Sequence, residues 1–196
     1  MIKYLRNFYC VVRYEAKNLL YKAIFPLIIY LAPTLAYSEQ KVFILGDSIT
    51  HGFGLAVEDG LVNQLSNWFA SEGLNVTFIN GGVSGDTTAG GLERLSWSLT
   101  DDVSALVVAL GANDVLRGFP PKLTRENLSA IIDIAENNKT PVLLVGTYAP
   151  GNYGEQYKLD FDAIFTDLVE EKRIACLLYT SPSPRDLSTS RMPSSA

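Results

Sequence analysis

The sequence predicts an α/β domain in which helices cover both faces of a parallel sheet. From Lys41 to about residue 175, short apolar runs alternate with amphipathic stretches, and the links between them are short. Strand–helix alternation of this kind builds parallel sheets with right-handed crossovers. One run, Ala105–Leu110, is apolar at every position, as expected of a central strand that is covered on both faces.

Each predicted element has its own signal along the chain. Short apolar runs predict strands at residues 42–45, 76–79, 105–110 and 142–145, and residues 174–179 could begin a fifth. Helical spacing of apolar residues predicts helices at 60–71, at 87–99, after Thr124 and at 156–172. The first helix has Leu61, Leu65, Trp68 and Phe69 at this spacing, and Gly73 stands where a C-cap is expected. Thr124 could cap the third helix.

The length and the charge of the chain limit the number of domains and the classes of partner. The 196 residues suffice for one domain, and 47% hydrophobic with 19% charged residues is typical of a globular protein. Residues 39–175 hold nineteen acidic and nine basic residues, whereas residues 1–38 hold five basic residues and one acidic. Because an acidic domain repels the phosphate backbone, we expect no nucleic-acid partner.

The residues that bind metals or form disulfides are scarce. The chain has two cysteines, Cys10 and Cys176, and one histidine, His51. A disulfide framework, a thiolate metal site and the common zinc clusters are therefore excluded, and we expect no metal.

The N-terminal 38 residues have the composition of an export signal. A basic start precedes Ala23–Tyr37, which has no charge but contains Pro26 and Pro33. Because fifteen residues is short for a membrane span, we expect a secretory leader that is cut near Ser38, and hence a periplasmic or secreted protein. An uncleaved membrane anchor and a buried helix of the domain remain alternatives.

The C-terminal segment does not continue the pattern. Residues 177–196 contain six serines and three prolines, so little of this segment can be buried. We expect the domain to occupy residues 39–175 and to lack its last strand and helix. Residues 176–196 are then a non-native or disordered tail.

Polar residues follow three of the predicted strands. Gly46-Asp47-Ser48 ends the first, a loop with three glycines and Asp86 ends the second, and Asn113-Asp114 follows the third. Ligands of open α/β sheets bind beyond the carboxyl ends of the strands. Each motif alone also has a structural explanation, since Asp and Ser cap helices and Asn and Gly form turns.

Taken together, these motifs carry a resemblance to a known family. GDSIT at 46–50, SGDT at 84–87, GLERL at 91–95 and LGANDVLRGFPP at 110–121 are similar to motifs of the SGNH (GDSL-type) hydrolases. Within that family the chain resembles the lysophospholipase/thioesterase I-like arylesterases, from about Lys41 to about residue 175. The resemblance implies a three-layer α/β/α fold with a flavodoxin-like sheet and a monomeric serine esterase without a cofactor. The implied substrates are small acyl esters or thioesters, including lysophospholipids.

The resemblance also implies roles for particular residues. Ser48 would be the nucleophile, and the amides of Ser48 and Gly85 with the Asn113 side chain would form the oxyanion hole. The family takes its base and the orienting carboxylate from a D-x-x-H motif after the last strand, and this sequence contains no such motif. We therefore expect a truncated chain with little turnover.

Other residues near the motifs receive lesser roles. His51, three residues after Ser48, is the one histidine that could act as the base. We expect Asp47 and Asp114 to fix loops by hydrogen bonds. Arg117 either braces the loop after the third strand or meets an acidic group of the substrate.

Two functions compete with the esterase. A non-catalytic module that binds acyl or glycan ligands would keep the fold without the chemistry. A flavodoxin-like nucleotide binder is disfavoured, because no loop matches G-x-G-x-x-G or the P-loop pattern.

Overall fold

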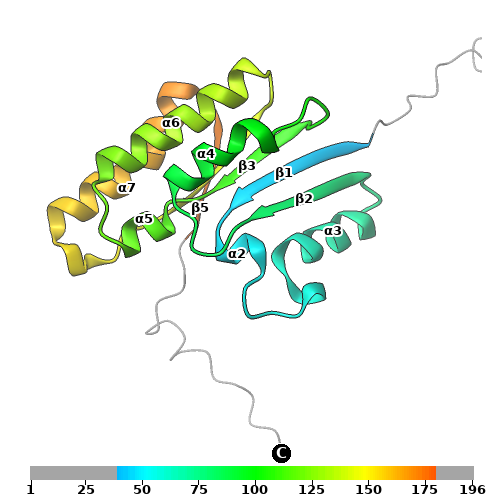
Figure 1. The fold of residues 1–196 in the computed structure, drawn as a ribbon, viewed down its shortest axis with the longest axis horizontal. Coiled ribbons are helices and arrows are strands. Elements are labelled where there is room, and N and C mark those ends of the chain that lie inside the picture. Colours follow the sequence, from blue (N-terminus) through cyan, green and yellow to red (C-terminus); the bar gives the residue numbers. More distant parts are fainter. Residues whose placement is uncertain (1–38, 180–196) are drawn as a thin grey trace, which may run out of the picture. The chain divides into compact units, whose positions relative to one another are not determined.

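The computed structural model describes residues 39–179, so the predicted leader and most of the predicted tail lie outside the described residues. The sheet has five parallel strands in the order β2-β1-β3-β4-β5 (Figure 1). They are β1 (Gln40–Gly46), β2 (Val76–Gly82), β3 (Ala105–Ala109), β4 (Val142–Thr147) and β5 (Ala175–Tyr179). The predicted parallel α/β architecture is confirmed.

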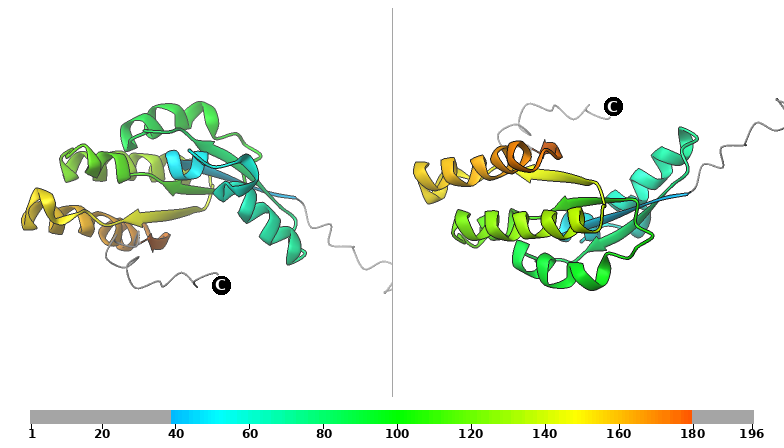
Figure 2. Two further views of the ribbon diagram at one scale, coloured as in Figure 1. Left: turned by 90° about the horizontal axis from the view of Figure 1, so that it is seen from below. Right: turned by 90° about the horizontal axis from the view of Figure 1, so that it is seen from above.

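The helices lie on both sides of this sheet. The longer helices are α3 (Leu61–Ser71), α4 (Thr88–Ser98), α6 (Pro121–Asn137) and α7 (Glu155–Lys172). In Figure 2, α4, α6 and α7 form a row on one side, whereas α3 lies on the other side against β2. Short elements complete the fold: α2 (Ser48–His51), α5 (Ala112–Leu116) and two 3-10 turns (Val57–Asp59 and Gly151–Tyr153). No helix among the described residues is both long and apolar enough to cross a membrane.

The main core lies between the sheet and the row of three helices. Its completely buried side chains include Leu45, Leu106, Val108, Leu144, Leu128, Ile131, Phe161 and Phe165. Full burial of side chains of this size stabilises a fold by roughly 1.5–3 kcal/mol each. On the opposite face of the sheet, Val107, Leu143 and Val145 are only half-buried.

Helix α3 differs from its prediction in the residues that it buries. Val62 is buried, whereas Leu61 and Trp68 are 40% and 57% exposed. The reason is that, among the described elements, α3 packs mainly against β2, α2 and the first 3-10 turn. Its buried stripe is therefore narrower than its apolar stripe.

The predicted capping role of Thr124 is wrong. Helix α6 begins at Pro121, which stands at the first helical position and has no N–H to leave unpaired. Thr124 is buried one turn later, and its hydroxyl donates a hydrogen bond to Asp114 at 3.3 Å. The threonine thus joins α6 to α5 instead of capping α6.

The fifth strand corrects the expected end of the sheet. Residues 175–179 pair with β4 along their whole length, from Ala175 opposite Leu143 to Tyr179 opposite Thr147. The expectation that the last strand is missing is therefore wrong for this strand, which extends beyond the expected boundary at residue 175. Its backbone hydrogen bonds with β4 hold it in the sheet. The predicted loss of the last helix concerns residues outside the described part of the chain.

Candidate active site

The strand order brings the three polar motifs to one place. The chain runs from β1 outward to β2 and then returns to β3 on the other side of β1. This reversal creates a switch point at the carboxyl ends of β1 and β3, where open α/β sheets bind ligands. Helix α2 follows β1 and α5 follows β3 at this end of the sheet (Figure 1). Both candidate side chains, Ser48 and Asn113, therefore stand at the switch point.

Ser48 is the first residue of α2. Asp47 caps this helix, since its carboxylate accepts a hydrogen bond from the Ile49 amide at 3.0 Å. Ser48 is half-buried, and neither its hydroxyl nor its amide donates a hydrogen bond to any residue between 39 and 179. A partly accessible hydroxyl and an unpaired N–H are two of the groups that nucleophilic attack on a carbonyl uses, and a base is the third.

Asp47 is a buried carboxylate at the centre of the site. It is 4% exposed, and its second oxygen lies 3.3 Å from Asn113 Nδ2. Burial raises the pKa of Asp47, the Ile49 amide lowers it through a hydrogen bond, and the nearby Asp86 carboxylate raises it. The folded chain therefore disfavours the ionised carboxylate relative to the unfolded chain.

The raised pKa of Asp47 predicts a pH dependence of stability. Its contribution to the free energy of unfolding is fully present below the ordinary pKa of an aspartate and is lost as pH rises through the raised value. We expect Asp47→Asn to be more stable relative to the wild type at pH 8 than at about pH 4, as measured by urea unfolding. Asp101→Asn, which changes an exposed carboxylate, is the control. An equal pH dependence in both variants contradicts this account of Asp47.

A tight turn after β2 presents the Gly85 amide. The Asp86 N–H donates to Val83 O at 3.0 Å, and Gly85 between them has a φ of 81°. Positive φ at the third position of a turn requires glycine. The Gly85 N–H has no hydrogen-bond partner within the described chain, and its carbonyl accepts from the Arg117 guanidinium at 2.7 Å. Arg117 thus braces the turn and leaves the amide free.

Asn113 connects the loops after β1 and β2. Its Nδ2 donates to the Asp86 carbonyl at 2.8 Å and lies 3.3 Å from the Asp47 carboxylate. These contacts fix the carboxamide between the residue that precedes Ser48 and the residue that follows Gly85. An acceptor that arrives beside Ser48 competes only with the longer of the two contacts.

Asp114 fastens α5 to the helices around it. It is 1% exposed and accepts hydrogen bonds from the Thr88 amide at 2.9 Å, the Thr88 hydroxyl at 2.5 Å and the Thr124 hydroxyl at 3.3 Å. These three hydrogen bonds hold Asp114 in place and thereby restrain its neighbour Asn113.

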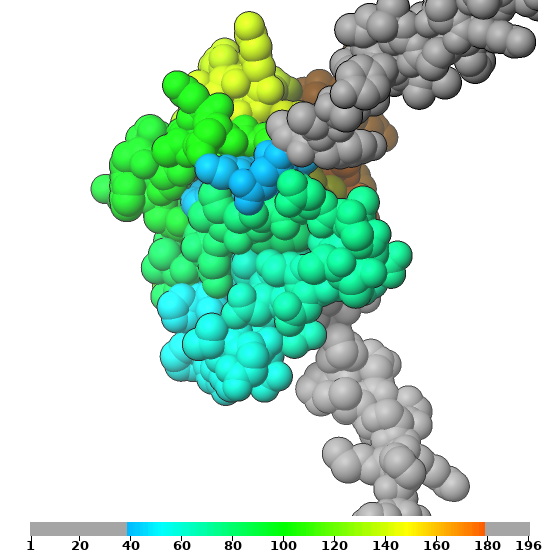
Figure 3. Space-filling view, turned by 90° about the vertical axis from the view of Figure 1, so that its right-hand side faces the viewer, coloured from blue at the N-terminus to red at the C-terminus, as the bar shows by residue number. Residues whose placement is uncertain are grey.

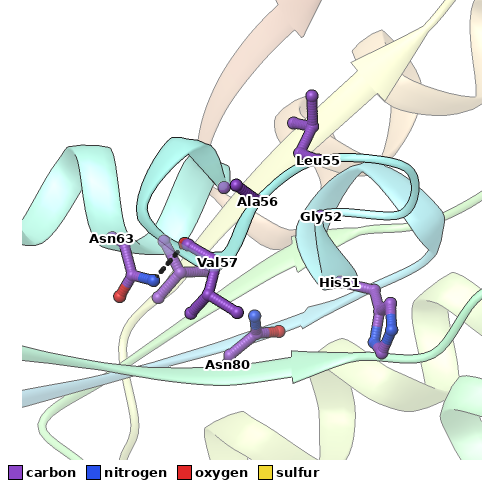
Figure 4. A pocket seen from close by; sticks show the side chains of 9 residues that line it. His51, Gly52, Leu55, Ala56, Val57, Asn63 and Asn80 are labelled. Atoms are coloured by element: carbon purple, nitrogen blue, oxygen red, sulfur yellow. Dashed lines mark hydrogen bonds between the residues drawn. The ribbon is translucent and has the colours of Figure 1, made fainter.

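His51 lies at the end of α2 and faces β2. Its Nδ1 is 3.3 Å from the Gly82 carbonyl. His51 lines a cavity of about 250 Å³ together with Asn63, Asn80 and Val57 (Figure 4); there Asn63 Nδ2 donates to the Val57 carbonyl. Within the described residues no hydrogen bond joins His51 to Ser48, so its role as a base stays a prediction.

Ser48 borders a different, larger hollow. This hollow has a volume of about 510 Å³ and is lined mainly by apolar side chains of α2, α3 and the loop between them. The apolar lining residues include Ile49, Phe53, Leu55 and Leu61, and the acidic residue Asp59 also lines the hollow. In Figure 3 the atoms of α2 and of the loop that follows it are drawn in cyan. An apolar hollow of this size that ends at a candidate nucleophile fits the apolar part of a small ligand.

Sequence reasoning gave no role to two residues at the site, Asp86 and Arg94. They form an ion pair at 2.8 Å between Nε and Oδ2, with side chains 13% (Arg94) and 12% (Asp86) exposed. One sequence signal could have indicated a role for Arg94: it directly precedes Leu95, which is buried in the core on α4. Within residues 39–179 no three His, Cys, Asp or Glu side chains gather as metal ligands.

Comparisons with known proteins agree with this geometry. Residues 44–183 match the model of the GDSL-like lipase/acylhydrolase family. An arylesterase of Vibrio mimicus is 38% identical over 138 residues, which cover 70% of this chain and 69% of the relative. The thioesterase 1/protease 1/lysophospholipase L1 of Escherichia coli K12 is 35% identical over 69% of this chain and 64% of its own length. The crystal structure of AlinE4, an SGNH-hydrolase family esterase, superposes on this chain with a TM-score of 0.68 at 33% identity. The match covers 76% of this chain and 89% of the AlinE4 chain.

Proposed function

Because the chain belongs to the GDSL-like lipase/acylhydrolase family of SGNH esterases, we propose that it hydrolyses carboxylic esters or thioesters through an acyl-serine intermediate on Ser48. One observation carries the proposal. Two unpaired N–H groups, of Ser48 and Gly85, and the carboxamide of Asn113 follow the carboxyl ends of three neighbouring parallel strands, at the same edge of the sheet as the Ser48 hydroxyl.

The proposed reaction has two halves. Ser48 Oγ attacks the ester carbonyl carbon while a base takes its proton, and a tetrahedral intermediate forms. This collapses to the acyl-serine as the alcohol or thiol leaves with a proton from the base. Water then attacks the acyl-serine in the same way and releases the acid. No metal or organic cofactor enters these steps.

The oxyanion is stabilised by three donors. The N–H groups of Ser48 and Gly85 are available, and Asn113 supplies the third donor by giving up its 3.3 Å contact with Asp47. The 2.8 Å bond to the Asp86 carbonyl holds the carboxamide during this exchange. The loss of one such donor typically raises the barrier by about 3 kcal/mol.

The sequence offers few candidates for the base. The chain contains no D-x-x-H motif, and the Nδ1 of its one histidine, His51, lies 3.3 Å from the Gly82 carbonyl. A serine hydroxyl is a poor nucleophile without a base. We therefore propose that the chain turns over slowly unless a base is supplied.

A small soluble base tests the proposal directly. Imidazole is expected to accelerate hydrolysis of p-nitrophenyl acetate by the chain in proportion to its concentration, because Ser48 is accessible from an open hollow. The rate with Ser48→Ala gives the background of imidazole alone. Equal rates for the two proteins at every imidazole concentration contradict the proposal.

The substrate class follows from the hollow beside Ser48. Its walls are mainly apolar, and the one charged group among its lining residues is the Asp59 carboxylate. Neutral esters with an apolar arm therefore fit better than anionic ones. We propose aryl and medium-chain acyl esters as substrates, with thioesters and lysophospholipids as members of the same class.

Phe53 is expected to contribute to this preference. It is 74% exposed and lines the hollow, so it can cover an apolar arm. Phe53→Ala should lower kcat/KM about tenfold for p-nitrophenyl octanoate or octyl acetate, measured with imidazole, and leave ethyl acetate unaffected. Trp97→Ala is the matched control, since Trp97 is also 74% exposed but lies on α4, outside the hollow. An equal loss with ethyl acetate, or no loss with either octyl substrate, overturns this role.

The cellular location is proposed from the sequence pattern. The basic and then apolar segment at residues 1–38 supports export of the domain, by a cleaved leader or with an uncleaved anchor. An esterase of this kind would then meet its substrates outside the cytoplasm. We propose that the domain acts as a monomer.

A further inference from the structure

Arg94 holds an ion pair that is almost closed to solvent. Its Nε donates to Asp86 Oδ2 at 2.8 Å, and the two side chains are 13% and 12% exposed. Gly90 leaves room for this pair, because a Cβ at that position would collide with Asp86 Oδ1. The absence of a side chain at Gly90 therefore lets the ion pair fit between α4 and the turn after β2.

The same guanidinium also reaches β1. Arg94 Nη2 donates to the Gly46 carbonyl at 3.1 Å, and that carbonyl accepts a second hydrogen bond from the Val83 amide at 3.0 Å. Arginine suits this bridge, because its planar fork presents two donors in a fixed geometry, whereas lysine has one flexible ammonium. One side chain thus ties the residue two before Ser48 to the turn that contains Gly85.

Asp86 contacts the segments that carry the other two proposed oxyanion donors, the Gly85 amide and the Asn113 carboxamide. Its amide closes the turn around Gly85 by bonding to Val83 O, and its carbonyl accepts from Asn113 Nδ2 at 2.8 Å. The position of Asp86 therefore sets where the Gly85 N–H and the Asn113 carboxamide lie relative to Ser48.

We propose that Arg94 is a positioning residue for the oxyanion hole, acting through Asp86 and the Gly46 carbonyl. The predicted effect of Arg94 on the reaction rate rests on the proposed function. The contacts to the Gly46 carbonyl and to Asp86 distinguish this role from that of an isolated ion pair, because each leads to a different part of the site. Displacement of reacting groups by about 1 Å costs roughly 10²-fold in rate.

Two variants and a control test the proposal in the full chain. Arg94→Met removes both contacts, and Arg94→Lys keeps the charge opposite Asp86 without the fork. Arg125→Met is the control, since it breaks an ion pair with Glu171 that lies on the exposed surface. Circular dichroism and urea unfolding establish that each variant is folded.

The first measurement does not depend on turnover. In ¹⁵N NMR spectra, with the Asn113 side-chain signals assigned from Asn113→Ala, we expect Arg94→Met to shift the Asn113 carboxamide and the Gly85 amide. Arg94→Lys should shift them less, and Arg125→Met should leave them in place. Unchanged signals in a folded Arg94 variant overturn the proposal, whatever the chain hydrolyses.

The second measurement is kinetic. With imidazole and p-nitrophenyl acetate, Arg94→Met is expected to lower kcat by roughly 10-fold to 100-fold with little change in KM, because the donors act mainly in the transition state. A normal kcat overturns the proposal. If the wild type shows no Ser48-dependent hydrolysis, the proposed function fails, and the NMR result still decides the positioning role.

Discussion

A segment that carries a D-x-x-H motif, joined after β5, is expected to raise kcat/KM for p-nitrophenyl acetate by roughly 10⁴-fold to 10⁶-fold. The proposed nucleophile and oxyanion donors lie within the described residues, and no base among residues 39–179 is hydrogen-bonded to Ser48. A family relative whose sequence carries this motif is a suitable source, and the Vibrio mimicus arylesterase, 38% identical over the matching region, is one relative to examine for it.

Two controls separate catalysis from a change in folding. The same segment with Ala in place of its Asp and His adds the same chain without the base, and it should give no increase. Ser48→Ala in the joined chain should return the rate to background. An increase that persists in either control contradicts the proposed roles of Ser48 and of the added histidine.

The second large effect concerns stability. Asp114→Ala is expected to lower the free energy of unfolding by about 3 kcal/mol or more, as measured by urea denaturation. The substitution leaves the Thr88 amide, the Thr88 hydroxyl and the Thr124 hydroxyl without their buried acceptor. The loss should be large because all three donors are shielded from water.

Matched variants define this effect. Asp114→Asn keeps one acceptor oxygen and should cost less than Asp114→Ala. Asp101→Ala, which removes an exposed carboxylate, should change stability by no more than about 0.5 kcal/mol. A similar small loss at position 114 contradicts the view that this carboxylate organises α4, α5 and α6.

The strands and the site loops could be predicted because their signals are local. Runs such as Ala105–Leu110 are apolar at every position, which is typical of strands inside a parallel sheet, although Val107 on the less covered face is only half-buried. The polar motifs stand directly after strands, and parallel pairing brings such positions together. The fold followed from these features and the family from the resemblance of the motifs, and both are confirmed.

The connections between the site loops could not be predicted, because they join residues far apart in the sequence. Arg94 bonds to the Gly46 carbonyl 48 positions earlier, and Asn113 reaches the Asp86 carbonyl 27 positions earlier. Helix α5 is five residues long and depends on these tertiary contacts instead of on a periodic apolar pattern. The exposure of Leu61 and Trp68 likewise depends on how little of the sheet α3 covers.

The covalent intermediate gives the most direct test of the whole account. The chain is incubated with an alkyl p-nitrophenyl phosphonate and imidazole, then digested, and the peptides are identified by mass spectrometry. Attachment of the phosphonyl group to Ser48, slowed in Asn113→Ala, is the expected result. An adduct on another side chain, or steady ester hydrolysis by a chain whose Ser48 stays unmodified, would show that the carbonyl is attacked elsewhere.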